Sequence, residues 1–222
     1  MADSDAVFPT TPILRLEHCV LRPYHVSDLE PMCAAANDPD IVRYMRDTFP
    51  YPYDREAGLN WLKICKAEGL PEEDEPASAA PASTAASKPE VPRPELTAAI
   101  CLLDGTFVGS TGLHVVGRDG TERYTRELGY WIGKAHWGRG LATEVAAGLG
   151  RWALSAASGI LTPDGQPLRR VEAGVYGENA ASVKVLERAG YVREGVRRQA
   201  VVKNGAMQDV VIFGLLASDL KK

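Results

Sequence analysis

Residues 133–142, GKAHWGRGLA, lie where a predicted strand ends and a predicted helix begins. The first N–H groups of a helix have no partners within the helix, and the helix dipole adds partial positive charge there. Gly138 and Gly140 let the backbone curve closely around an anion, which suits a pyrophosphate. Alone the pair is weak evidence, because glycines at such joints also serve packing. Thr143 stands where a dinucleotide fingerprint needs its third glycine, and no Walker GK[ST] follows.

A second motif follows about 40 residues later in the segment 179–191, NAASVKVLERAGY. Asn179 or Ser182 can cap the start of a helix, and Gly190 can end it. By itself this motif requires only a structural explanation.

On either side of these motifs, turn and periodicity signals predict the remaining elements. Before the loop they predict a strand over 13–25, a helix opened by a Ser27–Glu30 capping box and ending at Ala36, a short helix after Asp38-Pro39, a helix from Asp54 to about Glu68, a hairpin in 96–116 around Asp104-Gly105, and a strand that ends near Gly133. After it they predict a helix from Leu141, a strand over 169–176, the 179–190 helix and a hairpin turned by Asn204-Gly205. This order indicates a single α/β (α+β) domain over 13–220, preceded by a tail, 1–12.

Composition excludes several classes of protein. The 222 residues are 45% hydrophobic, enough for a packed core. A net charge of −4 argues against nucleic-acid binding, and no apolar run approaches the ~18 residues of a membrane span. The acidic, proline-broken start is unlike a secretory signal. Four scattered cysteines indicate neither a disulfide framework nor a metal site, so we expect free thiols and a cytoplasmic protein without a metal.

The segment 69–95 carries the whole net charge, because it holds six acids and two bases. It also has six of the 15 prolines and runs of Ala and Ser, which predicts a disordered insertion within the domain. A substrate lid or partner-binding tail and a tolerated surface insertion are both open interpretations.

Together the two motifs resemble the GNAT acetyltransferase superfamily, and more narrowly its RimJ/RimL-like branch. The resemblance extends from Ile13 to Leu220, apart from the insertion, and includes LRPY at its start, NDP, ELGYWIG, WGRGLATE and the terminal hairpin. It implies a central mixed, mostly antiparallel sheet flanked by helices, with two strands splayed at an acetyl-CoA cleft.

The resemblance also implies a cofactor site. In this family the loop matching 137–142 binds the acetyl-CoA pyrophosphate, and the preceding strand end holds the pantetheine arm and polarises the thioester carbonyl. Carried over residue by residue, the cofactor-binding positions are Trp131, Ile132, Gly133, Lys134, Trp137, Gly138, Arg139, Gly140, Leu141, Ala142, Thr143, Asn179 and Ser182. Ser182 matches a position near the cofactor sulfur.

The implied reaction is direct attack of an acceptor amine on the thioester, with backbone N–H groups near 132–134 stabilising the oxyanion. A lysine-like amine must first lose a proton at a cost of about 4–5 kcal/mol at pH 7, whereas an α-amine costs about 1 kcal/mol. Glu127 is the candidate base, acting through water. The structural alternative is an ion pair with Arg123 or Arg126, and His136 is a second candidate base.

The general acid is open. Many family members have a tyrosine seven residues after the asparagine, but this chain has Leu186 there. The role therefore passes to Ser182, to water or to no group, since a CoA thiol with a pKa near ~8.5 leaves readily.

The acceptor pocket is expected to include Phe49, Tyr51 and Tyr53, although aromatic residues in a proline-rich loop also serve as anchors. The acceptor is a small-molecule amine or a protein N-terminus, and the protein a monomer or homodimer. An alternative function on the same fold is a catalytically silent module that binds CoA or a partner.

Overall fold

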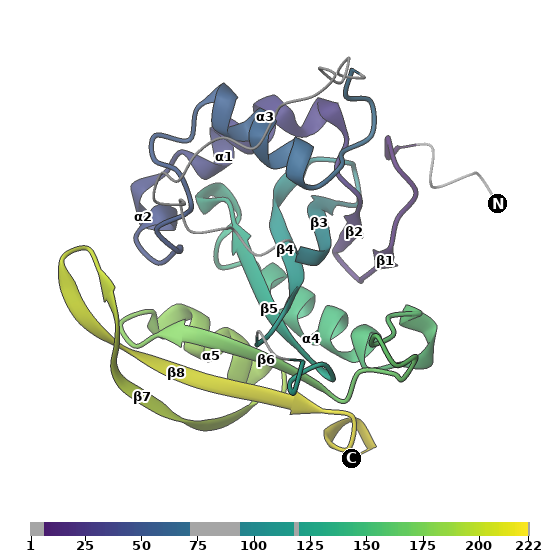
Figure 1. Cartoon of the computed structure of the whole chain (residues 1–222). Helices are drawn as coiled ribbons and strands as arrows, with labels where there is room; N and C mark the ends of the chain where they lie inside the picture. Colours follow the sequence, from purple (N-terminus) through teal and green to yellow (C-terminus); the bar gives the residue numbers. More distant parts are fainter. Residues whose placement is uncertain (1–6, 72–93, 118–119, 222) are drawn as a thin grey trace, which may run out of the picture.

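The computed structural model describes residues 7–71, 94–117 and 120–221, in which one sheet carries the strands in the order β1-β2-β3-β4-β5-β6-β8-β7 (Figure 1). The strands are β1 (Leu14–Arg15), β2 (Cys19–Arg22), β3 (Pro94–Leu102), β4 (Phe107–Val115), β5 (Thr125–Ile132), β6 (Arg170–Tyr176), β7 (Val192–Lys203) and β8 (Ala206–Leu216). The α-helices are α1 (Leu29–Ala36), α2 (Pro39–Val42), α3 (Arg55–Ile64), α4 (Leu141–Ala153) and α5 (Ala180–Arg188).

The pairing of β5 with β6 is the feature that shapes the site. Neighbouring strands pair antiparallel except these two, which run parallel and pair only between 125–127 and 170–172. Beyond that point the strands have no paired residues, so the sheet opens into a V. The predicted α/β class, with a mixed, mostly antiparallel sheet, is confirmed.

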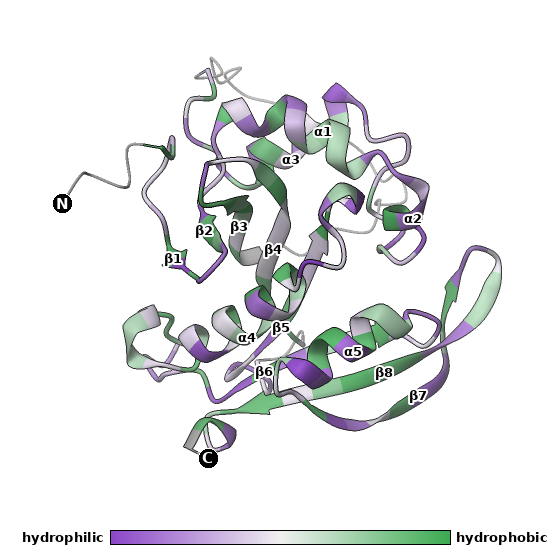
Figure 2. Cartoon of the chain, turned by 180° about the vertical axis from the view of Figure 1, so that it is seen from behind, coloured by the Kyte–Doolittle hydropathy of each residue, from purple (hydrophilic) through white to green (hydrophobic). Residues whose placement is uncertain are grey.

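Two hydrophobic cores form on opposite faces of the sheet. One contains residues of α1 and α3, and the other residues of α4 and α5 (Figure 1). Strand β2 contributes to both, because Val20 belongs to the first core while Cys19 and Leu21 belong to the second, as alternation along a strand requires. Along the terminal hairpin, β8 is largely hydrophobic and buried, whereas much of β7 is hydrophilic and exposed (Figure 2).

Turn chemistry explains the hairpins. Asn204 and Gly205 both have positive φ, 52° and 76°, as a type I′ turn requires, and they join β7 to β8 as predicted. The Asp104-Gly105 turn joins β3 to β4, which is also confirmed.

The start of the domain differs from the sequence-based prediction. The predicted strand 13–25 is instead two short strands, β1 and β2, which pair with each other. His18, between them, donates its backbone N–H to Glu144 of α4 at 2.8 Å, so a tertiary contact holds this turn.

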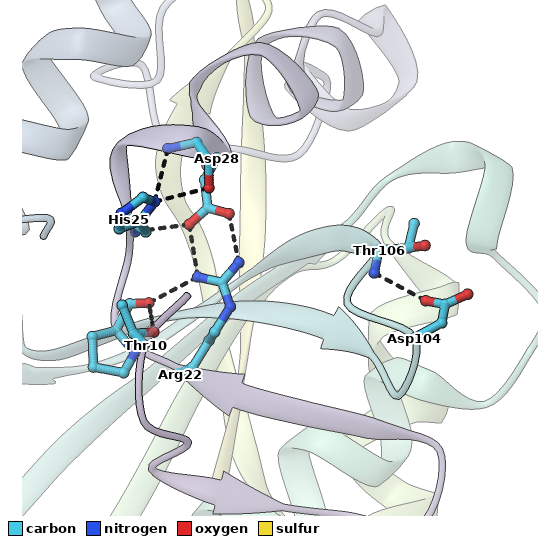
Figure 3. A network of polar contacts seen from close by, with 8 residues as sticks. Thr10, Arg22, His25, Asp28, Asp104 and Thr106 are labelled. Atoms are coloured by element: carbon cyan, nitrogen blue, oxygen red, sulfur yellow. Dashed lines mark hydrogen bonds and ion pairs between the residues drawn. The ribbon is translucent and has the colours of Figure 1, made fainter. Parts of the chain in front are cut away.

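The predicted Ser27–Glu30 capping box is wrong. The box is formed by His25 and Asp28 around the 3-10 turn Val26–Asp28 that precedes α1 (Figure 3). Asp28 also accepts two hydrogen bonds from Arg22, at 2.6 and 2.8 Å, and these side chains are only 3% and 2% exposed. The buried ion pair with Arg22 therefore holds Asp28 in the position from which it caps the turn together with His25.

Three boundaries are corrected as well. The helix after Asp54 ends at Ile64 rather than near Glu68. In the predicted insertion 69–95, residues 72–93 lie outside the described residues, but residues 94–95 begin β3. In the predicted tail 1–12, residues 1–6 also lie outside them, whereas Phe8 and Thr10 are buried against the domain.

Candidate active site

The opening between β5 and β6 exposes backbone hydrogen-bonding groups. Gly133 N–H bonds to Val108 O on β4, and an antiparallel ladder alternates from that pair. The N–H and C=O groups of Tyr130 and Ile132 therefore face away from β4, toward the side that β6 has left. The outward N–H groups can bind an oxyanion or a carbonyl oxygen, whereas the Ile132 C=O already accepts a hydrogen bond from the Trp137 indole.

The loop that follows β5 has the geometry of an anion site. Gly138 and Gly140 have φ values of 74° and 80°, and a Cβ added at either would meet no atom within 4 Å. Gly140 is the N-cap of α4 and supplies no side-chain cap, so the N–H groups of Leu141, Ala142 and Thr143 in the first turn are not capped by it. Leu141 is 3% exposed and belongs to the core that holds α4 and α5, so its side chain does not reach a ligand.

The polar side chains of this loop have partners within the fold. Trp137, about half exposed, donates its indole N–H to Ile132 O at 2.6 Å. The Lys134 ammonium pairs with Asp40 at 2.5 Å, which raises the lysine pKa and ties the loop to α2. Arg139 lies 3.0 Å from His136 Nδ1, which places the second candidate base beside the loop.

Alternation along β5 separates two sets of candidate side chains. Leu128, Tyr130 and Ile132 pack into the core that holds α4 and α5. Trp131 packs with Phe49 and Phe107 on the other face, so its indole lies on the opposite side of β5 from Ile132. Glu127, two positions from Gly129 and four from Trp131, belongs to that other face.

On the α5 side, Tyr130 and Ser182 meet. The tyrosine hydroxyl lies 2.7 Å from Ser182 Oγ, and burial raises the pKa of Tyr130 to about 12. Asn179 Oδ1 accepts a hydrogen bond from the Ser182 N–H at 3.1 Å, so Asn179 is the N-cap of α5. Leu186 is completely buried in the core.

On the opposite face, Glu127 Oε2 pairs with Arg46 at 2.5 Å, so the ion pair of the structural alternative does form, but with Arg46 rather than with Arg123 or Arg126. Glu127 Oε1 is 3.9 Å from the position of a Cβ on Gly174, so this oxygen is directed toward β6 beyond the point where the pairing ends. His114 lies directly across from Glu127 on β4. Burial, and then the charge of Arg46, lower the pKa of His114.

The three predicted acceptor aromatics lie in different environments. Tyr53 is 4% exposed and packs on Phe49 inside the core. Tyr51 is 55% exposed and lines an open hollow of about 590 Å³ between α2 and the terminal hairpin. Of the three, Tyr51 offers the most surface to a ligand.

Sequence reasoning missed the partners at this site. Arg46 and His114 carried no motif, and Tyr130 stood inside ELGYWIG with no visible partner. Each contacts or faces a residue at least 13 positions away, so no local spacing reveals it. Among the described residues, no group of three His, Cys, Asp or Glu side chains could hold a metal, and no helix is both long and apolar enough to cross a membrane.

Comparisons with known proteins identify related sequences and related folds. A family model described as "Acetyltransferase (GNAT) domain" matches residues 18–192. The "Uncharacterized N-acetyltransferase p20" of Bacillus licheniformis is 25% identical over 205 residues, which cover 91% of this chain and 95% of that protein. The "Probable N-acetyltransferase YjcK" of Bacillus subtilis is 32% identical over 52% of this chain and 58% of its own length.

Solved structures share the fold. Mycobacterium smegmatis RimJ in complex with CoA-disulfide has a TM-score of 0.67 and 24% identity, over 96% of this chain and 89% of that one. A GNAT-family acetyltransferase from Bacillus anthracis also has a TM-score of 0.67, at 17% identity over 91% of this chain and 97% of that one.

Proposed function

This chain belongs to the GNAT acetyltransferase family, and on that basis we propose that it transfers the acetyl group of acetyl-CoA to a primary amine by direct attack in a ternary complex. The observation that carries the proposal is the V between β5 and β6, with a helix start that no side chain caps at one end and a carboxylate on the opposite face. The resemblance of its WGRG loop and the shared RimJ fold support a place in the RimJ/RimL-like branch.

Residues already described would hold acetyl-CoA. The pyrophosphate would lie on the N–H groups at the start of α4, next to Gly138 and Gly140, and Arg139 would add positive charge. The pantetheine arm would run along the open edge of β5. The Ile132 N–H would meet the developing negative charge on the thioester oxygen, because it faces the opening.

Glu127 would handle the amine proton from the other face. Its Oε1 is directed toward the opening, while its Oε2 is held by Arg46. Arg46 already engages Oε2, so only Oε1 is left to accept a proton, and this geometry favours an acceptor that needs little help from a base. An α-amine loses its proton at pH 7 for about 1 kcal/mol, against about 4–5 kcal/mol for a lysine-like amine. We therefore favour a protein N-terminus or a small molecule with an amine of low pKa.

The hollow between α2 and the terminal hairpin is the proposed acceptor site. Tyr51, Glu178 and Gln208 line it, and Asp40 connects it to the cofactor loop through Lys134. An acceptor bound there would approach the V from the side that carries Glu127.

The test is release of CoA thiol from acetyl-CoA in the presence of a panel of amines and N-terminal peptides. We expect release that depends on the amine, with faster turnover for α-amines. Glu172→Gln is the matched control for changes at Glu127, because Glu172 faces it in register on β6 but pairs with Arg170. Binding of CoA without any amine-dependent release would contradict the enzyme and support a silent CoA-binding module.

A further inference from the structure

The Tyr130–Ser182 contact joins two elements at the α5 side of the V. Tyr130 comes from β5, Ser182 from the first turn of α5, and their oxygens are 2.7 Å apart. The serine main chain is fixed independently, because its N–H donates to Asn179. The Ser182 main chain is therefore fixed by Asn179 and its Oγ by Tyr130. The hydroxyl hydrogen of Ser182 can still rotate about the Cβ–Oγ bond.

The direction of this hydrogen bond follows from acidity. A phenol is a stronger donor than an aliphatic alcohol, and a serine hydroxyl has one proton and two acceptor lone pairs. We assign the tyrosine as donor and Ser182 Oγ as acceptor. This assignment leaves the serine proton available to a third group in the opening.

The difference between the two pKa values excludes transfer of the Tyr130 phenol proton to the CoA thiolate. Burial raises the pKa of Tyr130 to about 12, whereas a CoA thiol has a pKa near ~8.5. Moving a proton from this phenol to a thiolate would be uphill by a factor of more than a thousand. The pair can act on a thiolate through hydrogen bonding, but it does not replace the tyrosine acid whose position Leu186 occupies.

We propose that Tyr130 is a positioning residue that holds the Ser182 hydroxyl so that its proton points at the sulfur of the departing CoA. This role rests on the proposed function. As the bond from the acetyl carbon to sulfur breaks, the electron pair goes to sulfur, and the new carbon–nitrogen bond remains. The amine proton leaves through Glu127 to solvent. The thiolate accepts a hydrogen bond from Ser182 and takes its proton from solvent.

The first experiment titrates the thiol of CoA bound to the protein, by the ultraviolet absorbance of the thiolate. We expect the bound thiol to have a lower pKa than free CoA. Tyr130→Phe and Ser182→Ala should each raise it by up to about one unit, tenfold in acidity, the scale of a hydrogen bond to a charged group. Ser182→Thr keeps the hydroxyl and should keep most of the shift.

Tyr191→Phe is the matched control. Tyr191 is 4% exposed, and its hydroxyl donates to Ala146 O in the core, so the variant loses the same atom away from the opening. We expect it to change the melting temperature without changing the thiol pKa. An equal thiol pKa shift in Tyr191→Phe and Tyr130→Phe would overturn the proposal.

Steady-state kinetics provide a second readout. Tyr130→Phe should lower kcat about tenfold and leave the Kd for CoA unchanged, and it should have no further effect once Ser182→Ala is present. Effects that multiply in the double variant would overturn the coupling. CoA binding with the same thiol pKa in the unmodified protein and in Tyr130→Phe would overturn this role alone, whereas no CoA binding by the unmodified protein would overturn the proposed function with it.

Discussion

The variant Gly140→Ala should have two separate effects: backbone strain that lowers folding stability, and a weaker affinity for CoA. Gly140 has a φ of 80°, a left-handed conformation that costs an alanine about 1–2 kcal/mol. An added Cβ would meet no protein atom, so strain is the whole effect on folding. The same Cβ would enter the space proposed for the pyrophosphate and weaken at least one hydrogen bond to a charged group, worth about 1.5–3 kcal/mol. We therefore expect the Kd for CoA to rise about tenfold or more.

Gly159→Ala is the matched control. Gly159 also has a positive φ, 64°, and open space where an added methyl group would lie, but it is beyond the far end of α4. Urea denaturation should show a similar loss of stability in both variants. Calorimetric titration with CoA should show weaker binding in Gly140→Ala only. Equal CoA affinity in the two variants would refute the placement of the pyrophosphate at the start of α4.

Three further predictions concern the base and two ion pairs. Glu127→Gln should lower kcat most at low pH, where the acceptor amine is protonated, and the loss of kcat should shrink as pH rises. A pH–rate profile parallel to that of Glu172→Gln would exclude Glu127 as the base. Asp28→Asn should lower the free energy of unfolding, measured by urea denaturation, by about 3–5 kcal/mol, because it leaves the Arg22 charge buried without its partner. The double variant Arg22→Met with Asp28→Leu should lose less stability than either single change. Arg170 holds the pKa of Glu194 below its usual value, so this pair stabilises the fold at neutral pH and its contribution is lost as pH falls below about 4. Glu194→Gln should therefore be less stable than the unmodified protein at pH 7, and the difference should shrink as pH falls below about 4. A difference independent of pH would contradict the assignment.

Local signals predicted the elements that depend on neighbours in the chain. Asp54 caps α3 through Ala57, Asn179 caps α5 through Ser182, and Asn204-Gly205 turns the last hairpin, each within a few residues. The same reasoning failed at Ser27, where the sequence offered a sound capping box. Arg22 holds Asp28 in the interior through two hydrogen bonds, and Asp28 forms the box with His25 instead.

The loop at 133–142 and the helix after it could be read from the amino-acid order alone, because glycine conformation and helix periodicity act over a few residues. The side chains that meet on the two faces of the site depend instead on the folded sheet. Tyr130 meets Ser182 across 52 positions, and Arg46 meets Glu127 across 81. These contacts exist because β5 pairs with β4 along its length and with β6 over three residues, and that register is a property of the assembled sheet.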